Sequence, residues 1–145
     1  MKIPQLENLL KIGKLKREPA DQREFDQLIS SGVARLKDAA NETLNPDSRF
    51  DLAYNAAHSL ALAALRWHGY RPNGRYLVFQ TLGYTLEVES ADWRVLDDAH
   101  NKRNRAEYYG KYEVTESLID STISVTEKVA ELVQELGPTD PSSVT

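Results

Sequence analysis

The chain has 145 residues, of which 41% are hydrophobic and 28% are charged, and this balance is typical of a single globular domain and excludes wholesale disorder. The absence of cysteine excludes a disulfide scaffold, a thiolate metal site and a cysteine nucleophile, and it suits a reducing cytoplasm. The net charge of −4 argues against a protein that binds polyanions with its whole surface. No apolar run approaches the ~20 residues of a spanning helix, and the first residues lack the apolar stretch of a signal peptide, so we expect a cytoplasmic protein with no membrane partner.

Residues 1–19 are expected to form a short helix followed by a basic arm. The helix should run from near Pro4 to Gly13, with leucines on one side, and the stretch from Gly13 to Pro19 then breaks it. Five basic residues oppose two acidic ones over residues 1–19. The arm is therefore either a solvated terminus or a contact to nucleic acid.

Residues 20–137 are predicted to form an all-α fold, an antiparallel bundle of four long helices with one or two short ones. Asp21 has the capping-box spacing from Glu24 at the start of the first long helix. Asn45, Ser90 and Thr115 are the expected N-caps of the other three. A shorter helix is expected from Arg75 to about Tyr84, after a turn over residues 71–74, and residues 138–145 are expected to form a disordered tail because they carry no apolar anchor.

Apolar residues that recur at steps of three and four predict which side of each long helix faces the core. The expected core residues of the first helix are Phe25, Leu28, Ile29, Val33, Leu36 and Ala40. Those of the second are Phe50, Ala53, Tyr54, Ala57, Ala61, Ala64 and Leu65, and those of the last are Leu118, Ile119, Ile123, Thr126, Ala130, Val133 and Leu136.

The helix from Ser90 to Gly110 has a stripe that changes from apolar to polar. At about 100° per residue, five side chains fall within about 60° of His100: Trp93, Leu96, Arg103, Asn104 and Glu107. A buried charge needs a partner. Either Arg103 and Glu107 form an i,i+4 pair within a structural network, or the stripe opens into a cleft that has a cation, an amide and an imidazole on one wall.

The stretch from His100 to Gly110 resembles the signature of HEPN domains, which are small helical-bundle proteins. In that family an arginine and a polar residue, often asparagine, stand four to six residues before a histidine, late in a long helix. Arg103-Asn104 matches this opening, and residues 101–108 resemble a bacterial branch whose motif reads roughly K-R-N-x-x-E-Y. Residues 50–57 and 69–71 also resemble that branch, so the resemblance covers about residues 20 to 136.

The resemblance implies a homodimer, and in catalytic members the arginine and histidine, paired across the dimer, cleave RNA without a metal. Here Tyr108 stands in the position of the histidine, and no histidine follows Arg103. His100 lies one turn before Arg103, where it could act on a 2′-hydroxyl while Arg103 stabilises the phosphate charge. The candidate catalytic residues are therefore Arg103, Asn104, His100 and Tyr108, with Glu107 as the candidate for a structural network.

Tyrosines and basic residues are interleaved after the motif. Four basic residues oppose Glu107 alone over residues 102–111, and Lys102, Arg105, Tyr109 and Lys111 are the candidate nucleic-acid contacts, because aromatic rings stack on bases while cations bind phosphates. The alternative is that the tyrosines pack beneath solvated lysines. Some HEPN toxins are neutralised when a partner nucleotidyltransferase adenylylates a tyrosine just after the motif. The resemblance therefore implies that such a partner is possible for this chain. No metal and no cofactor are expected.

Two functions remain open from the sequence. The first is an RNA- or nucleotide-binding HEPN-like protein, with or without ribonuclease activity of toxin type. The second is a non-catalytic HEPN-like interaction or accessory subunit of a toxin–antitoxin or defence system. Because Tyr108 replaces the histidine, the sequence favours RNA or nucleotide binding without well-formed catalysis.

Overall fold

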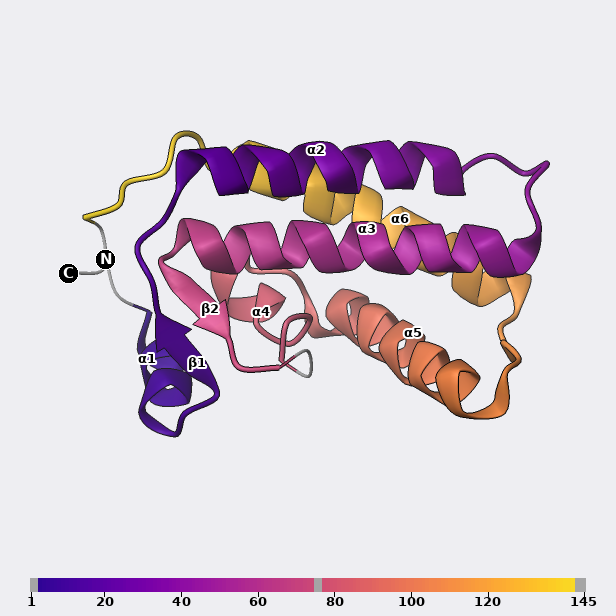
Figure 1. Cartoon of the computed structure of the whole chain (residues 1–145), viewed down its shortest axis with the longest axis horizontal. Helices are drawn as coiled ribbons and strands as arrows, with labels where there is room; N and C mark the ends of the chain where they lie inside the picture. The colour runs from indigo at the N-terminus through magenta and orange to yellow at the C-terminus, as the bar shows by residue number, and fades with distance from the viewer. Residues whose placement is uncertain (1–2, 75–76, 143–145) are drawn as a thin grey trace.

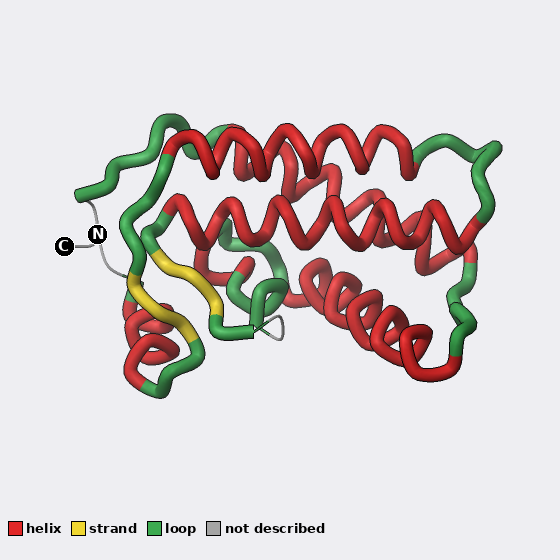
Figure 2. Tube along the Cα trace, viewed as in Figure 1, coloured by secondary structure: helices red, strands yellow, loops and turns green. Residues whose placement is uncertain are grey.

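The computed structural model describes residues 3–74 and 77–142, and these residues form six helices and two three-residue strands (Figure 2). The all-α prediction is confirmed. In chain order the elements are α1 (Pro4–Lys11), β1 (Leu15–Arg17), α2 (Gln22–Ala39), α3 (Pro46–Trp67), β2 (Tyr70–Pro72), α4 (Leu82–Thr85), α5 (Ser90–Tyr109) and α6 (Glu116–Gln134).

The long helices α2, α3 and α6 pack against one another, and the contact between α2 and α3 is the most extensive. Figure 1 shows α2 and α3 side by side with α6 behind them, and α6 contacts both. Helix α5 contacts α3 and α6, but it slants away from α3 toward its own C-terminal end (Figure 1). This divergence leaves the last turns of α5 outside the tightly packed part of the molecule.

Three of the four predicted N-caps are confirmed by side-chain hydrogen bonds. Asp21 accepts from the backbone N–H groups of residues 23 and 24, Asn45 accepts from that of Asp47, and Thr115 accepts from that of Leu118. The prediction for Ser90 is wrong, because Ser90 is the first residue of α5 and Glu89 is its N-cap, with no side-chain cap.

The predicted core side of α2 is partly wrong. Val33 and Ala40 are exposed, whereas Gly32 and Ala39 are buried in their place. The cause is close packing against α3: a Cβ on Gly32 would lie 2.6 Å from Cγ of Leu60. Glycine lets the two helices approach at this point, and the helix is rotated so that residue 32 rather than residue 33 faces inward.

The sequence did not predict the small antiparallel sheet, in which β1 pairs with β2 and Leu15 lies opposite Pro72. Leu15 is buried with Leu6, Leu65 and Tyr70 in a second core cluster. Leu15 in the basic arm is therefore packed in the fold and is not part of a solvated terminus. Strands of three residues are too short for a period-two pattern to appear in the sequence. The turn predicted over residues 71–74 is wrong in its first half, because Arg71 and Pro72 belong to β2.

The helix expected from Arg75 to Tyr84 is shorter than predicted. Its first two positions lie outside the described residues, residues 77–81 form turns, and only Leu82–Thr85 is helical. Val78 and Leu82 are fully buried, as expected. The apolar spacing therefore identified the inward side, although it overstated the length of the helix.

Arg66 forms a buried ion network that joins the N-terminal segment to the bundle. Its Nε lies 2.6 Å from Glu24, and its Nη atoms donate to the backbone carbonyls of Glu18 and Pro19 at 2.9 and 2.7 Å. Arg71 binds both Glu18 and Glu24 at 2.6 Å. Because the Arg66 side chain is only 2% exposed, this pairing is required for burial of its charge.

Within residues 3–74 and 77–142, no helix combines the length and the apolar character that are needed to cross a membrane. After α6 ends, Thr139 donates two hydrogen bonds to the side chain of Gln22, through its backbone N–H and its hydroxyl.

Candidate functional site

The polar stripe of α5 begins inside the core and ends at the surface. Along this stripe Leu96 and His100 are buried, Arg103 and Asn104 are half-buried, and Glu107 is exposed. The helix ends at Gly110, which has a left-handed conformation with φ of 70°. The predicted change from apolar to polar along one stripe therefore coincides with the emergence of the helix from the bundle.

His100 is buried, and both of its ring nitrogens have protein partners. Nδ1 lies 2.8 Å from the hydroxyl of Tyr54 on α3, and Nε2 lies 3.1 Å from the amide nitrogen of Asn104. Because an amide nitrogen only donates, Nε2 accepts, and the neutral imidazole carries its proton on Nδ1. His100 would have to release Asn104 before Nε2 could take a proton from a substrate.

Arg103 lies at the edge of this network. Its Nη1 donates to Glu107 at 2.8 Å, and its Cζ lies 5.0 Å from the centre of the Tyr54 ring, which places the cation over the aromatic face. The Arg103 side chain is 21% exposed and that of Glu107 is 61% exposed. The predicted i,i+4 pair is present, and part of the guanidinium remains open to solvent.

The segment after α5 is fixed to the start of α3 by Tyr112. Its hydroxyl donates to Asp51, and its ring meets Phe50 edge-on with centroids 5.3 Å apart. Burial and the hydrogen bond to Asp51 raise the pKa of Tyr112 to about 12. The sequence did not identify Asp51 as a candidate site residue. Only the cluster of tyrosines after the motif pointed to Tyr112.

Glu107 and Tyr112 line a depression of about 250 Å³ together with Asp47, Ala106, Gly110 and Lys111. Arg103 and Asn104 are not part of its lining. The charged and aromatic residues that line this depression are therefore two acidic residues, one lysine and one tyrosine. Arg103 and Asn104 instead contact Tyr54 and His100.

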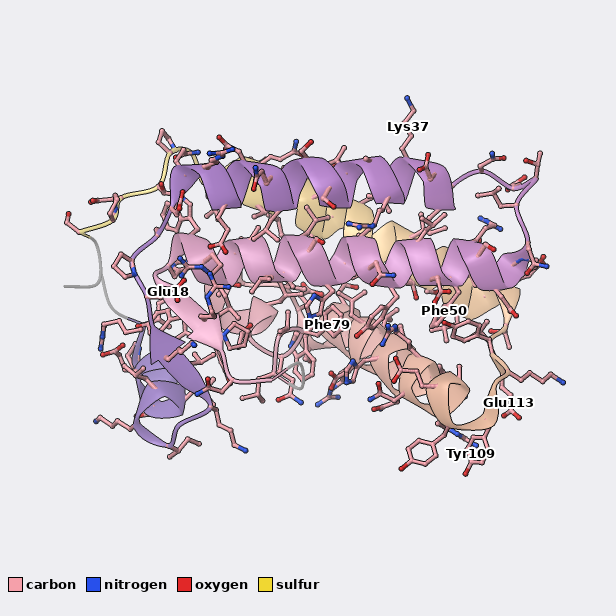
Figure 3. All side chains as sticks on the ribbon, in the orientation of Figure 1. Glu18, Lys37, Phe50, Phe79, Tyr109 and Glu113 are labelled. Carbon is pink, nitrogen blue, oxygen red and sulfur yellow. The ribbon has the colours of Figure 1, made fainter. Side chains whose placement is uncertain are left out.

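Five side chains gather at the C-terminal end of α5, and we call them the basic–aromatic tip: Lys102, Arg105, Tyr108, Tyr109 and Lys111. Tyr108 is 89% exposed and Tyr109 is 76% exposed, and their rings lie 6.3 Å apart. The other three residues of the tip line a small depression with Tyr109 and Glu113, and Figure 3 shows Tyr109 and Glu113 at this end of the molecule.

Tyr108, which stands in the position of the family's histidine, is separated from the Arg103 network. Five residues along a helix correspond to a rotation of about 140°, so Tyr108 lies on a different face of α5 from Arg103. Its large exposed fraction agrees with this position. The structure therefore brings together Arg103, Asn104, His100 and Glu107 and leaves Tyr108 with the tip.

The two other histidines lie among aromatic and backbone groups. The ring of His58 is 6.3 Å from that of Tyr54 and 6.1 Å from that of Phe79. His68 is the C-cap of α3, and its Nε2 lies 3.1 Å from the backbone oxygen of Thr85. Burial lowers the pKa of His68, so its ring is neutral at pH 7. Among the residues that the structure describes, no three histidine or acidic side chains are grouped as metal ligands.

No family model, curated protein or solved structure matches this chain significantly. The HEPN resemblance stays a prediction that depends on the residues of α5 and α3 quoted above.

Proposed function

We propose that the chain is a HEPN-like protein that binds single-stranded RNA or nucleotides through the basic–aromatic tip. The single observation that carries this proposal is the exposure of Tyr108 and Tyr109 beside Lys102, Arg105 and Lys111. Exposed tyrosine rings offer stacking surfaces for unpaired bases, and the cations offer contacts for the phosphates between them. Because the rest of the chain is acidic on balance, binding should be confined to this end of the molecule.

Binding without efficient cleavage is the form of this function that the geometry supports better. Both ring nitrogens of His100 are engaged within the protein, and Tyr108 lies on another face of α5 from Arg103. An unperturbed tyrosine, with a pKa of ~10, is also a poor base near neutral pH. A metal-independent ribonuclease of toxin type would require His100 to exchange Asn104 for the substrate.

Fluorescence anisotropy with a labelled single-stranded RNA tests the binding proposal. We expect Arg105→Ala to weaken binding by about threefold to tenfold, and Tyr109→Ala to weaken it by a similar factor through the loss of stacking. Tyr109→Phe keeps the ring and should bind as the unmodified protein does. Lys37→Ala is the matched charge control, because Lys37 is exposed on α2, far from the tip (Figure 3).

An equal loss in Lys37→Ala and Arg105→Ala would show diffuse electrostatic attraction and would contradict the proposal, as would the absence of saturable binding. Incubation of the RNA with concentrated protein in a chelator separates binding from catalysis. We expect intact RNA. Cleavage that survives the chelator and is lost in His100→Ala or Arg103→Ala would establish the ribonuclease instead.

The second candidate is a non-catalytic interaction or accessory subunit of a toxin–antitoxin or defence system. One observation favours it: the Arg103–Glu107 pair and the His100–Asn104 contact are satisfied within the subunit, while the two tyrosines of the tip are free to meet a protein. The partner would be a second copy of the chain or a nucleotidyltransferase acting on a tyrosine of the tip, in the cytoplasm. Light scattering of the purified protein should then show a dimer that Tyr108→Ala or Tyr109→Ala dissociates.

A further inference from the structure

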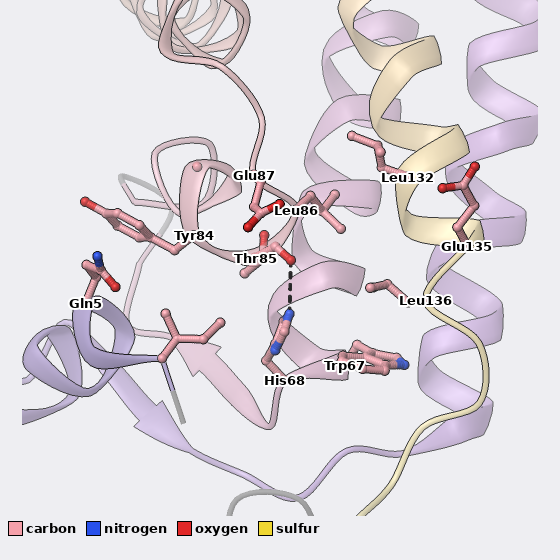
Figure 4. A pocket seen from close by; sticks show the side chains of 12 residues that line it. Gln5, Trp67, His68, Tyr84, Thr85, Leu86, Glu87, Leu132, Glu135 and Leu136 are labelled. Atoms are coloured by element: carbon pink, nitrogen blue, oxygen red, sulfur yellow. Dashed lines mark hydrogen bonds between the residues drawn. The ribbon is translucent and has the colours of Figure 1, made fainter. Parts of the chain in front are cut away.

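The two ends of the molecule differ in the charge that they offer to a ligand. A pocket of about 750 Å³ lies where α1, α3, the α4 segment and α6 meet, at the other end of the molecule from the basic–aromatic tip (Figure 4). Two glutamates and no lysine or arginine are among the described residues that line it. A phosphate group would be repelled there, so the contacts to a nucleotide are expected at the tip.

A small depression in the tip carries charges of both signs. It is lined by three cationic side chains, one aromatic ring and one carboxylate: Lys102, Arg105, Lys111, Tyr109 and Glu113. Its volume is about 10 Å³. This is about the space that a single water molecule needs, so the depression accommodates one group of the size of a hydroxyl and neither a base nor a whole phosphate.

Glu113 is held at this depression by the residues that precede it. Gly110 ends α5 in a left-handed conformation and redirects the chain. Tyr112 is fixed to α3 by its hydrogen bond to Asp51 and by the contact of its ring with Phe50. Glu113 follows directly, is exposed, and lies at the end of the molecule that carries the tip (Figure 3). The structure therefore adds to the tip a carboxylate that the sequence did not identify.

The mixed charge of the depression favours a group that both donates and accepts hydrogen bonds. Within the described part of the chain, the side chain of Glu113 forms no hydrogen bond or ion pair, although three cations line the same depression. A phosphate oxygen only accepts, and Glu113 would repel it. An amino group only donates, and the three cations would oppose it. A hydroxyl can donate to Glu113 and accept from a neighbouring cation at the same time.

We propose that Glu113 accepts a hydrogen bond from a ribose 2′-hydroxyl and thereby makes the basic–aromatic tip selective for RNA over DNA. This inference rests on the proposed function, because it assigns the depression to an RNA strand. Within a strand the 3′-hydroxyl is esterified, so the 2′-hydroxyl is the free one, and it lies next to a phosphate. Acidic side chains bind ribose hydroxyls in other nucleotide sites. The base of the same nucleotide stacks on Tyr109, and the adjacent phosphates contact the cations of the tip.

Fluorescence anisotropy with three labelled oligouridylates of about eight nucleotides tests this proposal on the unmodified protein. The three have the same bases and carry a 2′-hydroxyl, a 2′-hydrogen or a 2′-fluorine. The fluorine keeps the sugar conformation of RNA but cannot donate a hydrogen bond. We expect the 2′-hydroxyl form to bind about threefold to tenfold more tightly than each of the other two.

Glu113→Ala should bring the ratio of the RNA and deoxy affinities close to one, while the deoxy form binds at least as tightly as before, because a negative charge near its phosphates is removed. A merely structural effect would change both affinities by the same factor. Glu116→Ala is the matched control, since Glu116 is exposed in the first turn of α6 and does not line the depression, and it should keep the preference for RNA.

Several results would overturn this inference and leave RNA binding at the tip intact: equal affinity for the RNA and deoxy forms, binding of the 2′-fluoro form as tight as that of RNA, or a preference for RNA that persists in Glu113→Ala. A preference lost equally in Glu116→Ala would also overturn it, because any nearby negative charge would then have the same effect. Absence of saturable binding of all three oligonucleotides would instead contradict the proposed function itself, and this inference with it.

Discussion

His100 lies between Tyr54 and Asn104, with each ring nitrogen within hydrogen-bond distance of one of them, whereas Arg103 lies at the rim of the same network. These two members of the predicted catalytic set therefore differ in what they contribute to stability. His100 is 4% exposed and fills part of the core. Arg103 contributes one i,i+4 ion pair and one contact with an aromatic face.

We expect His100→Ala to lower the free energy of unfolding by about 2–4 kcal/mol, because it creates a cavity and removes the partner of the Asn104 amide. Arg103→Ala should cost about 1 kcal/mol, the combined scale of an exposed ion pair and a cation–π contact. Urea unfolding followed by circular dichroism measures both, with Asn101→Ala as the control at an exposed position of α5. Equal losses in the two variants would contradict this division of roles.

Prediction from the sequence failed at residues whose environment is created by distant parts of the chain. Arg66 follows a predicted core stripe, but its burial depends on Glu18, Glu24 and two carbonyl groups more than 40 positions away. The same is true of Asp51 at the start of α3, which accepts a hydrogen bond from the distant Tyr112. The local pattern could predict the Arg103–Glu107 pair, because both residues belong to one helix.

At the scale of elements, the long helices were predictable because their apolar residues recur at helical spacing and their caps are local motifs. The close contact of α2 with α3 was not predictable, because it depends on Gly32. Glycine has no apolar side chain from which a core position can be recognised in the sequence. A glycine inside a helix normally costs about 1 kcal/mol relative to alanine, so its presence here indicates a packing requirement.

Gly32→Ala should therefore destabilise the protein by about 1–2 kcal/mol, since overpacking against buried Leu60 outweighs the gain in helix propensity. Ser30→Ala, at an exposed position of α2, should be neutral or slightly stabilising. In the double variant with Leu60→Ala, the cost of Gly32→Ala should shrink or reverse, because the side chain that blocks the new Cβ is gone. Stabilisation by Gly32→Ala alone would show that α2 moves away from α3 without loss.

At the scale of the whole molecule, the N-terminal segment is joined to the bundle by the pairing of β1 with β2, by a hydrogen bond from Tyr70 to Glu7, and by two larger groups of side-chain contacts. The second core cluster buries Leu6 and Leu15 against the end of α3 and β2, and the ion network joins Glu18 and Glu24 to Arg66 and Arg71. The apolar contact does not depend on pH. The ion network does, because its carboxylates must be ionised to compensate Arg66.

We expect acid to weaken the ion network that joins the N-terminal segment to the bundle before it affects the apolar contact. Hydrogen bonding to Arg71 lowers the pKa of Glu18; burial alone would raise the pKa of Glu24, but hydrogen bonds from Arg71 and Arg66 outweigh it and lower that pKa as well. Carboxyl groups with lowered pKa values stabilise the folded state above their ordinary pKa of ~4.3, and this stabilisation is lost as the pH falls through the folded-state values. The free energy of unfolding should thus decrease below about pH 5.

Urea unfolding between neutral pH and about pH 3 measures this dependence, and hydrogen exchange at β1 and β2 locates it. Glu24→Gln should be destabilised at neutral pH and should lose less further stability on acidification, because one of the two titrating partners of Arg66 is gone. Asp26→Asn, an exposed charge change on the same helix, should keep the slope of the unmodified protein. If the strands exchange no faster in acid than the centre of α3 does, the ion network does not hold the N-terminal segment, and the leucine cluster and the pairing of β1 with β2 must do so.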